Sequence, residues 1–585
     1  MSPLPFTAAT DVVTLTITVD GTALGGSVPI LGAEVVSQAN RIPYARLRIG
    51  DGDPARGDFP QSSGDLFVPG ASLSISAGYR GKVEAVFSGV VLTQRVVVRR
   101  GSSWLEVEAR DATFKMTLVR KNRYFEKQSD SEAVGTLLND YSSDGVSAGD
   151  ITATSVVHPQ LLQYQATDWD FMVSRLEAGG QLCFIDGGKV SSSKPSLSGT
   201  PVAELGFGAG GTVLELDAEI DARTQTGGVR ALAWDPSGQS LLDVSAADPQ
   251  WSGNGNLTAD KLSGASGRKE DLLWHGGALP SDALQSIADG AMLRARLAAS
   301  HGRVRFPGVT AVKPGSVLKL SRLSDRFNGT VYVTGVRHEF GGGSWTTDAE
   351  FGLPRETHAE RVPMSHLPAA GLAPAVHGLQ VGVVTELTGD PDNEHRIRVK
   401  VPLAGMDEQG VWARVATLDA GDQRGMVFRP EKNDEVVLGF FHGDPGQPVV
   451  LGMLHSSAKA PPITPTDDND EKVYVSRSKV ALRFDDKKKV AILETPGGNR
   501  LTLSDDDGGI KLEDQNGNSI VMNKDGIALT SDKKAVTIKA KSDLKAEAMN
   551  AEIKATSGAT VKGSSKAEIS SSGKLTVKGS MVMIN

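Results

Sequence analysis

The stretch "IKATSGATVKGSSKAEISSSGKLTVKG", residues 553–579, places an aliphatic residue at every eighth position. The repeating residues are Ile553, Val561, Ile569 and Val577, and the residue two places before each is Ala551, Ala559, Ala567 or Leu575. Residues two apart in a β-strand point to the same face of a sheet. Each repeat therefore aims two side chains at one narrow core, with Ser, Gly, Lys and Glu filling most of the other positions.

An eight-residue unit of this kind cannot hold itself folded. Burying an aliphatic side chain gives roughly 1.5–3 kcal/mol, whereas ordering eight residues costs on the order of 8–16 kcal/mol of backbone entropy. Three copies wound about one axis would pair every strand edge with a neighbouring chain and bury the aliphatic residues together. We therefore predict a trimeric rod, an intertwined triple-stranded β-helix. A disordered low-complexity tail and a single-chain solenoid are the alternatives.

The same pairing of apolar residues continues toward the N-terminus, with less regular spacing, as in Ile527/Leu529. The residues predicted to form the trimer core are Ile510, Leu512, Ile520, Met522, Val536, Ile538, Ile553, Val561, Ile569, Leu575 and Val577.

The composition favours β-structure and shows no excess of basic residues. Only 5% of the 585 residues are aromatic, glycine occurs 66 times, and the net charge is −8. These values favour strands with many turns and make nucleic acid a poor partner. Cys183, the single cysteine, lies in the apolar run "QLCFID" and is interpreted as a core residue. No run of 18 apolar residues occurs, so no stable membrane insertion is expected.

Strand and helix signals divide the chain into a strand-rich N-terminal region, a small barrel and the rod. Helices are predicted within residues 129–141, which Ser129 and Asp130 can cap, within 166–180, which Gly179 and Gly180 end, and within 280–300. Many alternating strands surround them. Five short strand signals between 375 and 457 are typical of a small barrel. The predicted fold class is mainly β, with the divisions 1–353 (strand-rich, with inserted helices), 354–374 (linker), 375–457 (small barrel), 458–471 (linker) and 472–585 (rod).

The barrel phrases "GDPDNEHRIRVKVP", "VWARVATLDAG" and "GMVFRPEKNDEVVLGFFHGDPGQPVVLGMLH" resemble the OB-fold domain of the VgrG and phage tail hub-and-spike family. "YQATDWDFMVSRLEAGG" and "PGSVLKLSRLSDRFNGTVYVTGVRHEF" resemble parts of that family's hub, and "GNRLTLSDDDGGIKLEDQNGNSIVMNKDGI" resembles the start of its spike. Residues 190–275 are the least recognisable part, and the polar segment 235–275 is longer than a simple barrel connection.

The resemblance implies a structural protein of a contractile injection machine, either a type VI secretion system or an extracellular phage-tail-like particle. It implies a homotrimer whose hub carries two related barrels per chain, near 1–125 and 200–353, so that three chains match a hexameric inner tube protein. It also implies baseplate subunits as partners, and a PAAR-type tip protein seated on Met581, Val582, Met583, Ile584 and Asn585. Such a rod would breach the target envelope mechanically.

No enzymatic site, cofactor or metal is expected. The stretch 456–475 is too short to hold the lysozyme domain of the phage relative, and no toxin extension follows Asn585. Acid pairs such as Asp485/Asp486 and the acids at 505–507 are interpreted as turn residues, and His442 with Asp444 as part of a structural turn. No histidine follows His455, so the chain would carry no histidine-bound metal tip of its own.

Two functions are the alternatives to an injection-machine spike: a tail-associated cell-wall hydrolase and a receptor-binding tail fibre. An OB-fold that binds single strands is disfavoured, because residues 375–457 contain seven Lys/Arg against twelve Asp/Glu. The N-terminal residues contain no signal peptide pattern. We therefore expect synthesis in the cytoplasm, assembly into a baseplate, and delivery outside the cell or into a target.

Overall fold

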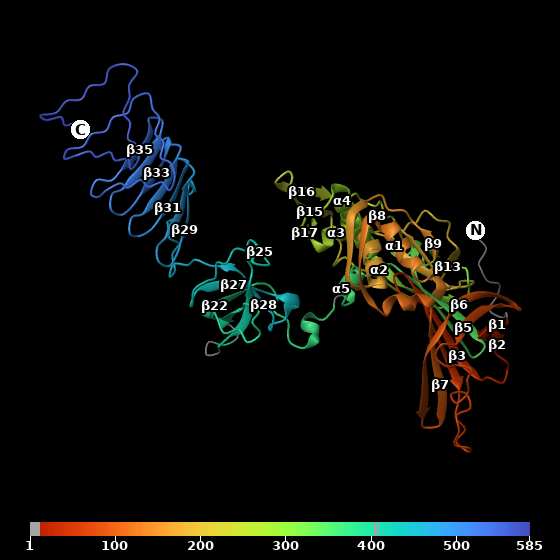
Figure 1. Ribbon diagram of the computed structural model, residues 1–585. Helices are drawn as coiled ribbons and strands as arrows, with labels where there is room; N and C mark the ends of the chain where they lie inside the picture. The colour runs from red at the N-terminus through yellow and green to blue at the C-terminus, as the bar shows by residue number, and fades with distance from the viewer. Residues whose placement is uncertain (1–11, 365, 403–404, 406–408, 585) are drawn as a thin grey trace. The chain divides into compact units, whose positions relative to one another are not determined.

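The computed structural model describes residues 12–364, 366–402, 405 and 409–584. Strand accounts for 40% of the structure and helix for 12%, so the predicted mainly β fold is confirmed. The chain forms two compact units, Met1–Ala375 and Val376–Asn585, and each is described here by itself (Figure 1). None of the helices in the described ranges is long and apolar enough to span a membrane.

One large sheet organises the first unit. It runs in the order β14-β18-β21-β20-β3-β4-β7-β6-β5-β1-β2, with β13 and β19 attached through β20. The strands are β1 (Val13–Val19), β2 (Thr22–Ala23), β3 (Ile30–Gln38), β4 (Tyr44–Gly50), β5 (Ser72–Tyr79), β6 (Lys82–Arg99), β7 (Ser102–Arg110), β13 (Ala203–Gly206), β14 (Glu215–Ile220), β18 (Ser300–Pro307), β19 (Val317–Ser321), β20 (Gly329–Gly341) and β21 (Ser344–Phe351).

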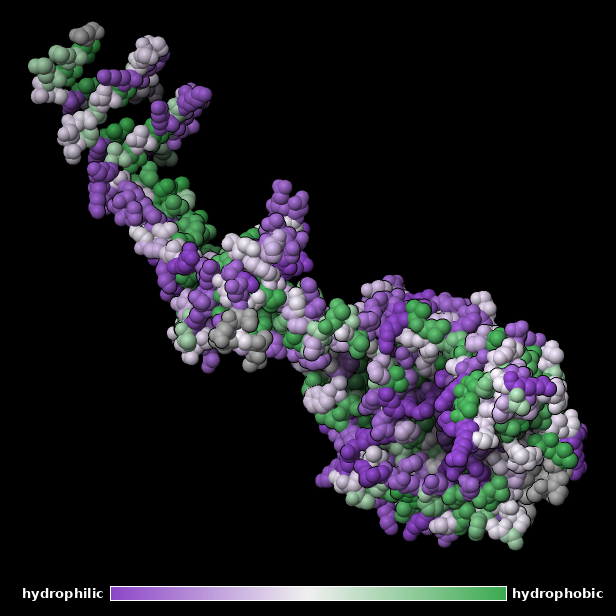
Figure 2. Space-filling model, turned by 90° about the horizontal axis from the view of Figure 1, so that it is seen from below, coloured by the Kyte–Doolittle hydropathy of each residue, from purple (hydrophilic) through white to green (hydrophobic). Residues whose placement is uncertain are grey.

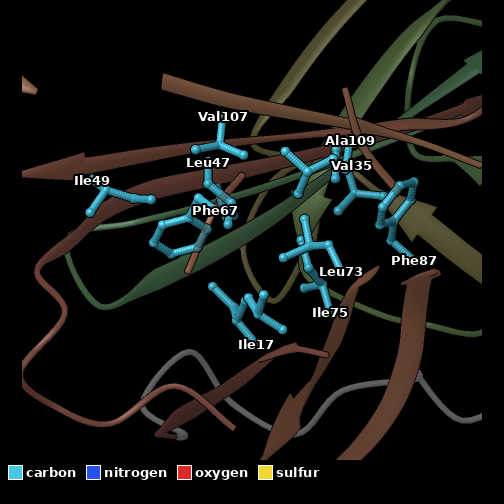
Figure 3. Close-up of a cluster of buried hydrophobic side chains, with 14 of the residues drawn as sticks. Ile17, Val35, Leu47, Ile49, Phe67, Leu73, Ile75, Phe87, Val107 and Ala109 are labelled. Atoms are coloured by element: carbon cyan, nitrogen blue, oxygen red, sulfur yellow. The ribbon is translucent and has the colours of Figure 1, made fainter. Parts of the chain in front are cut away.

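The two strand-rich halves predicted for the hub each have a core of their own. In the first, side chains from β3 to β7 converge with Phe67, which lies between strands and is fully buried (Figure 3). The second is built from β13 and β18–β21 around Phe306 and Phe351. The halves are joined, because β20 pairs with β3 from Gly335↔Gln38 to Phe340↔Ala33. Phe340 and Trp345 of the second half pack into the first core.

A helical layer connects the halves. It contains η1 (Ala112–Thr117), β8 (Arg120–Ser129), α1 (Asp130–Asn139), η2 (Ser142–Asp144), β9 (Ser147–Ile151), β10 (Val157–Thr167), α2 (Asp168–Ala178), β11 (Leu182–Asp186) and β12 (Lys189–Ser193). The predicted N-cap of α1 is confirmed, since Ser129 accepts from the N–H of Glu132 in a capping box. Cys183 is buried, as expected, and burial raises the pKa of its thiol to about 12.

The polar segment 235–275 is not a plain loop. Together with its neighbours it forms a small three-stranded sheet in the order β16-β15-β17, made of β15 (Val229–Asp235), β16 (Ser240–Ser245) and β17 (Asp271–His275). Helix α4 (Ser281–Leu297) packs on it through Ala288, and α3 (Ala259–Ser266) lies within the segment. Helix α3 was not predicted, because its eight residues, "ADKLSGAS", include a single large apolar side chain, Leu262.

The segment that follows β21 is fastened to the hub by buried polar contacts. It contains α5 (His358–Arg361) and η3 (Pro368–Gly371). Glu177, at the end of α2, accepts from the backbone N–H of His358 at 2.6 Å, from Asn40 Nδ2 at 2.6 Å and from Arg294 Nη2 at 2.8 Å. The His358 ring lies 2.8 Å from Asp170 Oδ1. This network ties the first residues of the predicted linker to the helical layer.

The second unit begins with a closed five-stranded barrel in the order β22-β23-β24-β28-β27. Its strands are β22 (Gln380–Glu386), β23 (Ile397–Lys400), β24 (Val411–Val415), β27 (Glu435–Phe440) and β28 (Pro448–Met453), with β25 (Ala420–Gly421), β26 (Arg424–Gly425) and η5 (Phe441–Gly443) in its loops. Val384, Ile397, Val399, Val436 and Leu438 are fully buried inside it. The predicted OB-type barrel is confirmed.

A buried histidine gives the hub a defined pH dependence. His338 in β20 is 7% exposed and lies 2.9 Å from Thr347 Oγ1 through Nδ1. Burial lowers the pKa of the His338 imidazole to about 4. In the unfolded chain the His338 imidazole therefore takes up a proton as the pH falls below 6.5. In the folded hub the same imidazole takes up its proton only near pH 4.

We expect this difference to remove about 3 kcal/mol of hub stability as the pH falls from 6.5 to 4, and none above 6.5. Urea unfolding of the hub at several pH values measures it. His338→Gln should flatten the loss over that window relative to the wild-type protein. An unchanged pH profile in the variant would assign the loss to other groups.

Candidate assembly interface

The barrel is followed by a seven-stranded antiparallel meander, shown in blue in Figure 1. Each strand has five residues: β29 (Glu471–Val475), β30 (Ala481–Asp485), β31 (Val490–Glu494), β32 (Arg500–Ser504), β33 (Gly509–Glu513), β34 (Ser519–Asn523) and β35 (Gly526–Thr530). Every neighbouring pair is hydrogen-bonded within the chain. From the sequence we expected the strand edges of the rod to pair with other chains, whereas the strands between residues 471 and 530 pair with one another within the chain.

The register aligns apolar residues in two columns on one face of the sheet. One column runs through the partners Tyr474, Leu482, Leu493, Leu501, Leu512, Ile520 and Leu529. The second runs through Phe484, Ala491, Leu503, Ile510, Met522 and Ile527. Members of the two columns are two residues apart on each strand, so both columns face the same side.

This apolar face has no covering layer among the described residues. Leu493, Leu503 and Leu512 are 48%, 45% and 49% exposed, and Ile527 is 76% exposed. Hydrophobic surface is visible along the C-terminal part of the chain in Figure 2. The opposite face is mixed. It carries the ion pairs Arg483–Glu494 and Lys511–Glu513, and the row that contains Arg483 and Lys511 also contains Val473, Ile492 and Val521.

A sheet with an exposed, continuous apolar face needs a second layer. Domains bury apolar sheet faces against another element, and contiguous exposed apolar patches mark association sites. In the barrel, by contrast, Val384 and Ile397 are fully buried without any partner chain. The apolar face of the meander therefore needs a partner, whereas the apolar core of the barrel does not.

The sheet and the barrel are in contact within the second unit. The rings of Phe428 and Tyr474 meet edge to face, with centroids 5.0 Å apart. Arg477 Nη1 lies 3.1 Å from a carboxylate oxygen of Glu431. The first strand of the meander is thus anchored to a barrel loop.

The structure brings together some of the predicted core residues and not others. Ile510, Leu512, Ile520 and Met522 lie side by side in the two columns. Val536, Ile538, Ile553, Val561, Ile569, Leu575 and Val577 fall in residues 531–584, where the structure assigns no helix or strand, and they are 51–86% exposed. The column residues that precede Ile510 were not predicted as core residues. The same alternation is nevertheless present in "LRF", residues 482–484, and "LTL", residues 501–503.

The predicted tip platform is exposed and apolar where it is described. Met581, Val582, Met583 and Ile584 are 79%, 49%, 79% and 91% exposed. Asn585 lies outside the described residues.

The acidic residues interpreted as turn residues lie mostly in turns. Asp486 and residues 505–507 lie in the turns that follow β30 and β32. Asp485 is instead the last residue of strand β30. His442 belongs to the short turn η5. No group of three or more His, Cys, Asp or Glu side chains arranged to hold a metal occurs in the described ranges.

Comparison with known families covers most of the chain. Residues 9–341, more than half of the protein, match the family described as Alg8 N-terminal domain. Residues 380–455 match the type VI secretion system/phage-baseplate injector OB domain, and residues 489–585 match the phage baseplate V C-terminal trimerisation domain. The chain belongs to the family of the Alg8 N-terminal domain. Its C-terminal part resembles VgrG and phage tail spike proteins in both its OB domain and its trimerisation domain.

Curated relatives match this protein over short stretches. The type VI secretion system spike protein VgrG4b of Pseudomonas aeruginosa is 32% identical over 128 residues, which are 20% of this chain and 16% of the relative. The actin cross-linking toxin VgrG1 of Vibrio cholerae is 27% identical over 137 residues, 22% of this chain and 12% of the relative. The matched parts of these curated proteins thus span less than a quarter of their own length.

Solved structures similar to this protein include two tail proteins. The 43 kDa tail protein of prophage MuSo2 from Shewanella oneidensis has a TM-score of 0.45 at 10% identity, covering 59% of this chain and 99% of that one. The tail protein from Neisseria meningitidis has a TM-score of 0.44 at 15% identity, covering 58% and 96%.

Proposed function

We propose that this protein is the homotrimeric hub and central spike of a contractile injection machine. The observation that carries the proposal is the uncovered two-column apolar face of β29–β35. Three such faces packed around one axis would bury the columns in a shared core and leave the mixed faces, with their ion pairs, on the outside. The match of residues 489–585 to a trimerisation domain supports the same arrangement.

The residues after β35 would continue the rod in the trimer. In one chain they have nothing to pack against, since Ile553, Val561 and Ile569 are 77–86% exposed. Three chains would supply the strand partners that the eight-residue repeat lacks. Leu575 and Val577 would form the last buried layer, and the exposed apolar residues 581–584 would seat a PAAR-type tip protein.

The first unit would adapt the trimer to the rest of the machine. Its two strand-rich halves per chain would give three subunits six similar surfaces, which suits a hexameric inner tube protein. The proposed divisions are hub 1–353, OB-fold domain 375–457 and spike 472–585, separated by linkers. Baseplate subunits would contact the hub, and the assembled particle would act outside the cell or in a target.

The proposed role is mechanical and non-enzymatic. Family relatives are named as spike proteins, whereas the relative named as a toxin matches this chain over only 12% of its length. A hydrolase would instead clear a suspension of cell walls. A tail fibre would bind intact cells through its C-terminal region.

Light scattering on the purified protein tests the trimer. We expect the full chain to have three times the mass of the 61.5 kDa protomer. A chain cut after Ala460, which lacks the whole meander and the repeat, should lose most of its trimer at micromolar concentration. A full chain that stays monomeric, with a tail that proteases remove at once, would refute the proposed rod.

A further inference from the structure

A short hairpin stands out from the barrel between β24 and β27. It spans residues 417–427, which we call the arm, and contains β25 and β26, paired through Ala420↔Gly425. The backbone N–H of Met426 donates to the carbonyl of Asp419 at 2.9 Å, which continues the same register toward the barrel. Every residue of the arm is exposed, and β25 lies at the margin of the barrel in Figure 1.

The register gives the arm one apolar and one charged face. Continued by one more pair, it places Leu418 opposite Val427, on the same face as Ala420. Leu418 is 91% exposed and Val427 is 83% exposed, so no described residue covers this face. The other face carries an ion pair, with Arg424 Nη1 2.6 Å from Asp419 Oδ1. A two-stranded hairpin is marginal in water by itself, so the arm needs a surface to pack on.

The outside of the barrel offers an apolar surface on three neighbouring strands. Strand β27 lies between β22 and β28, with Val381 opposite Val437 and Gly439 opposite Val449. Leu451 lies over Gly439, because a Cβ on this glycine would be 3.2 Å from Leu451 Cδ1. Val381 and Leu451 are 44% and 51% exposed. The outward-facing aliphatic residues of these strands, which we call the stripe, are Val381, Val383, Val437, Val449 and Leu451.

The stripe is confined to one side of the barrel. On the neighbouring strands β23 and β24, the guanidinium of Arg398 lies over the ring of Trp412, 5.7 Å from its centroid, and 3.3 Å from a carboxylate oxygen of Glu386. That side has the polar groups usual for a surface in water. The stripe is therefore a local feature, of the kind that marks an association site.

The arm ends beside the face of the meander that we propose to be buried in the trimer. Phe428 follows the arm directly and meets Tyr474 edge to face, with ring centroids 5.0 Å apart. Tyr474 is the first residue of one apolar column. Arg477 and Glu431, 3.1 Å apart, tie the same barrel loop to the meander. A second copy of the chain that packs on the columns therefore comes close to the arm.

We propose that the apolar face of each arm packs on the stripe of the next copy of this chain in the trimer. The inference rests on the proposed trimer and adds a second contact to it, between the barrels. Each chain gives one arm and receives one, so three head-to-tail contacts close into a ring. Leu418 and Val427 become buried, and the Arg424–Asp419 ion pair stays in water.

Disulfide cross-linking of the full-length protein tests this contact. The variant Leu418→Cys/Leu451→Cys places one thiol on the arm and one on the stripe. The native Cys183 is buried, and burial raises the pKa of its thiol to about 12, so it stays unreactive. After oxidation with diamide, we expect covalent dimers and trimers on a denaturing gel without reductant. The pair Leu418→Cys/Glu394→Cys, with its second thiol on an exposed loop outside the stripe, should stay at the mass of one chain.

Two neighbouring residues on opposite faces of the arm supply a matched control. Added to the cross-linking variant, Val427→Asp should lower the yield of cross-linked trimer at least tenfold, because it puts a charge on the face that packs. Met426→Asp lies on the charged face and should leave the yield unchanged. Light scattering should show an intact trimer in both variants, since the rod holds the chains together.

The same experiment separates this inference from the proposed function. A trimeric full chain in which the arm and stripe cysteines form no disulfide, or only one within a single chain, would overturn the arm contact and leave the trimer standing. Equal loss of cross-linking in Val427→Asp and Met426→Asp would also overturn it, because the apolar face would then have no special role. A full chain that is monomeric would refute the trimer itself, and the arm contact with it.

Discussion

Leu503→Asp should break the trimer into monomers, whereas Thr502→Asp should leave it intact. The two residues are neighbours on β32 but face opposite sides of the sheet, since Leu503 pairs with Ile510 and Thr502 with Lys511. In the proposed trimer, three aspartates would be buried around one axis. An uncompensated buried charge costs several kcal/mol, so the three together would cost roughly 10 kcal/mol per trimer.

Sedimentation or light scattering at micromolar protein distinguishes the two variants. The barrel should remain folded in both, which the circular dichroism spectrum can establish. If Leu503→Asp and Thr502→Asp lose the trimer equally, the sheet is sensitive to any charge and the two-column face is not the interface. If neither loses it, the trimer is held elsewhere in the chain.

Glu177→Ala should lower the free energy of unfolding of the hub by about 3–5 kcal/mol, the cost of removing one partner of a buried ion pair. The change leaves Arg294 buried without an anion and removes the acceptors of Asn40 Nδ2 and of the backbone N–H of His358. Glu177 is 4% exposed, so water cannot replace the lost contacts without opening the packing.

Urea unfolding followed by hub fluorescence measures this loss. Glu219→Ala is the matched control, because Glu219 is 58% exposed and forms only long ion pairs with Arg223 and His301. The control should change stability by no more than about 0.5 kcal/mol. A loss of similar size in both variants would mean that the network around Glu177 is not a stabilising unit. In the Glu177 variant we also expect faster proteolysis near residues 353–361.

Local patterns in the sequence predicted much of the fold. The alternating strands of the barrel, the N-cap Ser129 and the helix ended by Gly179 each depend on neighbouring residues, and the structure has all of them. The barrel was the most recognisable part because its strands are short, evenly spaced and apolar on alternate residues.

Pairings between residues that are far apart in the chain could not be predicted from the sequence. Nothing local in β3 or β20 indicates that Val36 and Arg337 are partners, although this pairing joins the halves of the hub. Glu177, Arg294 and His358 are separated by long stretches, so their buried network has no sequence signature. In the meander, the apolar residues two apart could be recognised in the sequence. The pairing of these strands within one chain could not, because alternation determines which face of the sheet a side chain lies on and not which strand is its neighbour.

Sharing β20 between the two halves has a consequence for how the hub opens. Strand β20 is bonded to β21 on one side and to β3 on the other, and its Phe340 is buried in the first core. Opening either half would break the hydrogen bonds between β20 and β3, which join the two halves. We therefore expect that neither half exchanges its core amide hydrogens by opening alone. Amide hydrogen exchange should report both halves as a single cooperative unit, and a pull applied to one would be felt along the whole sheet.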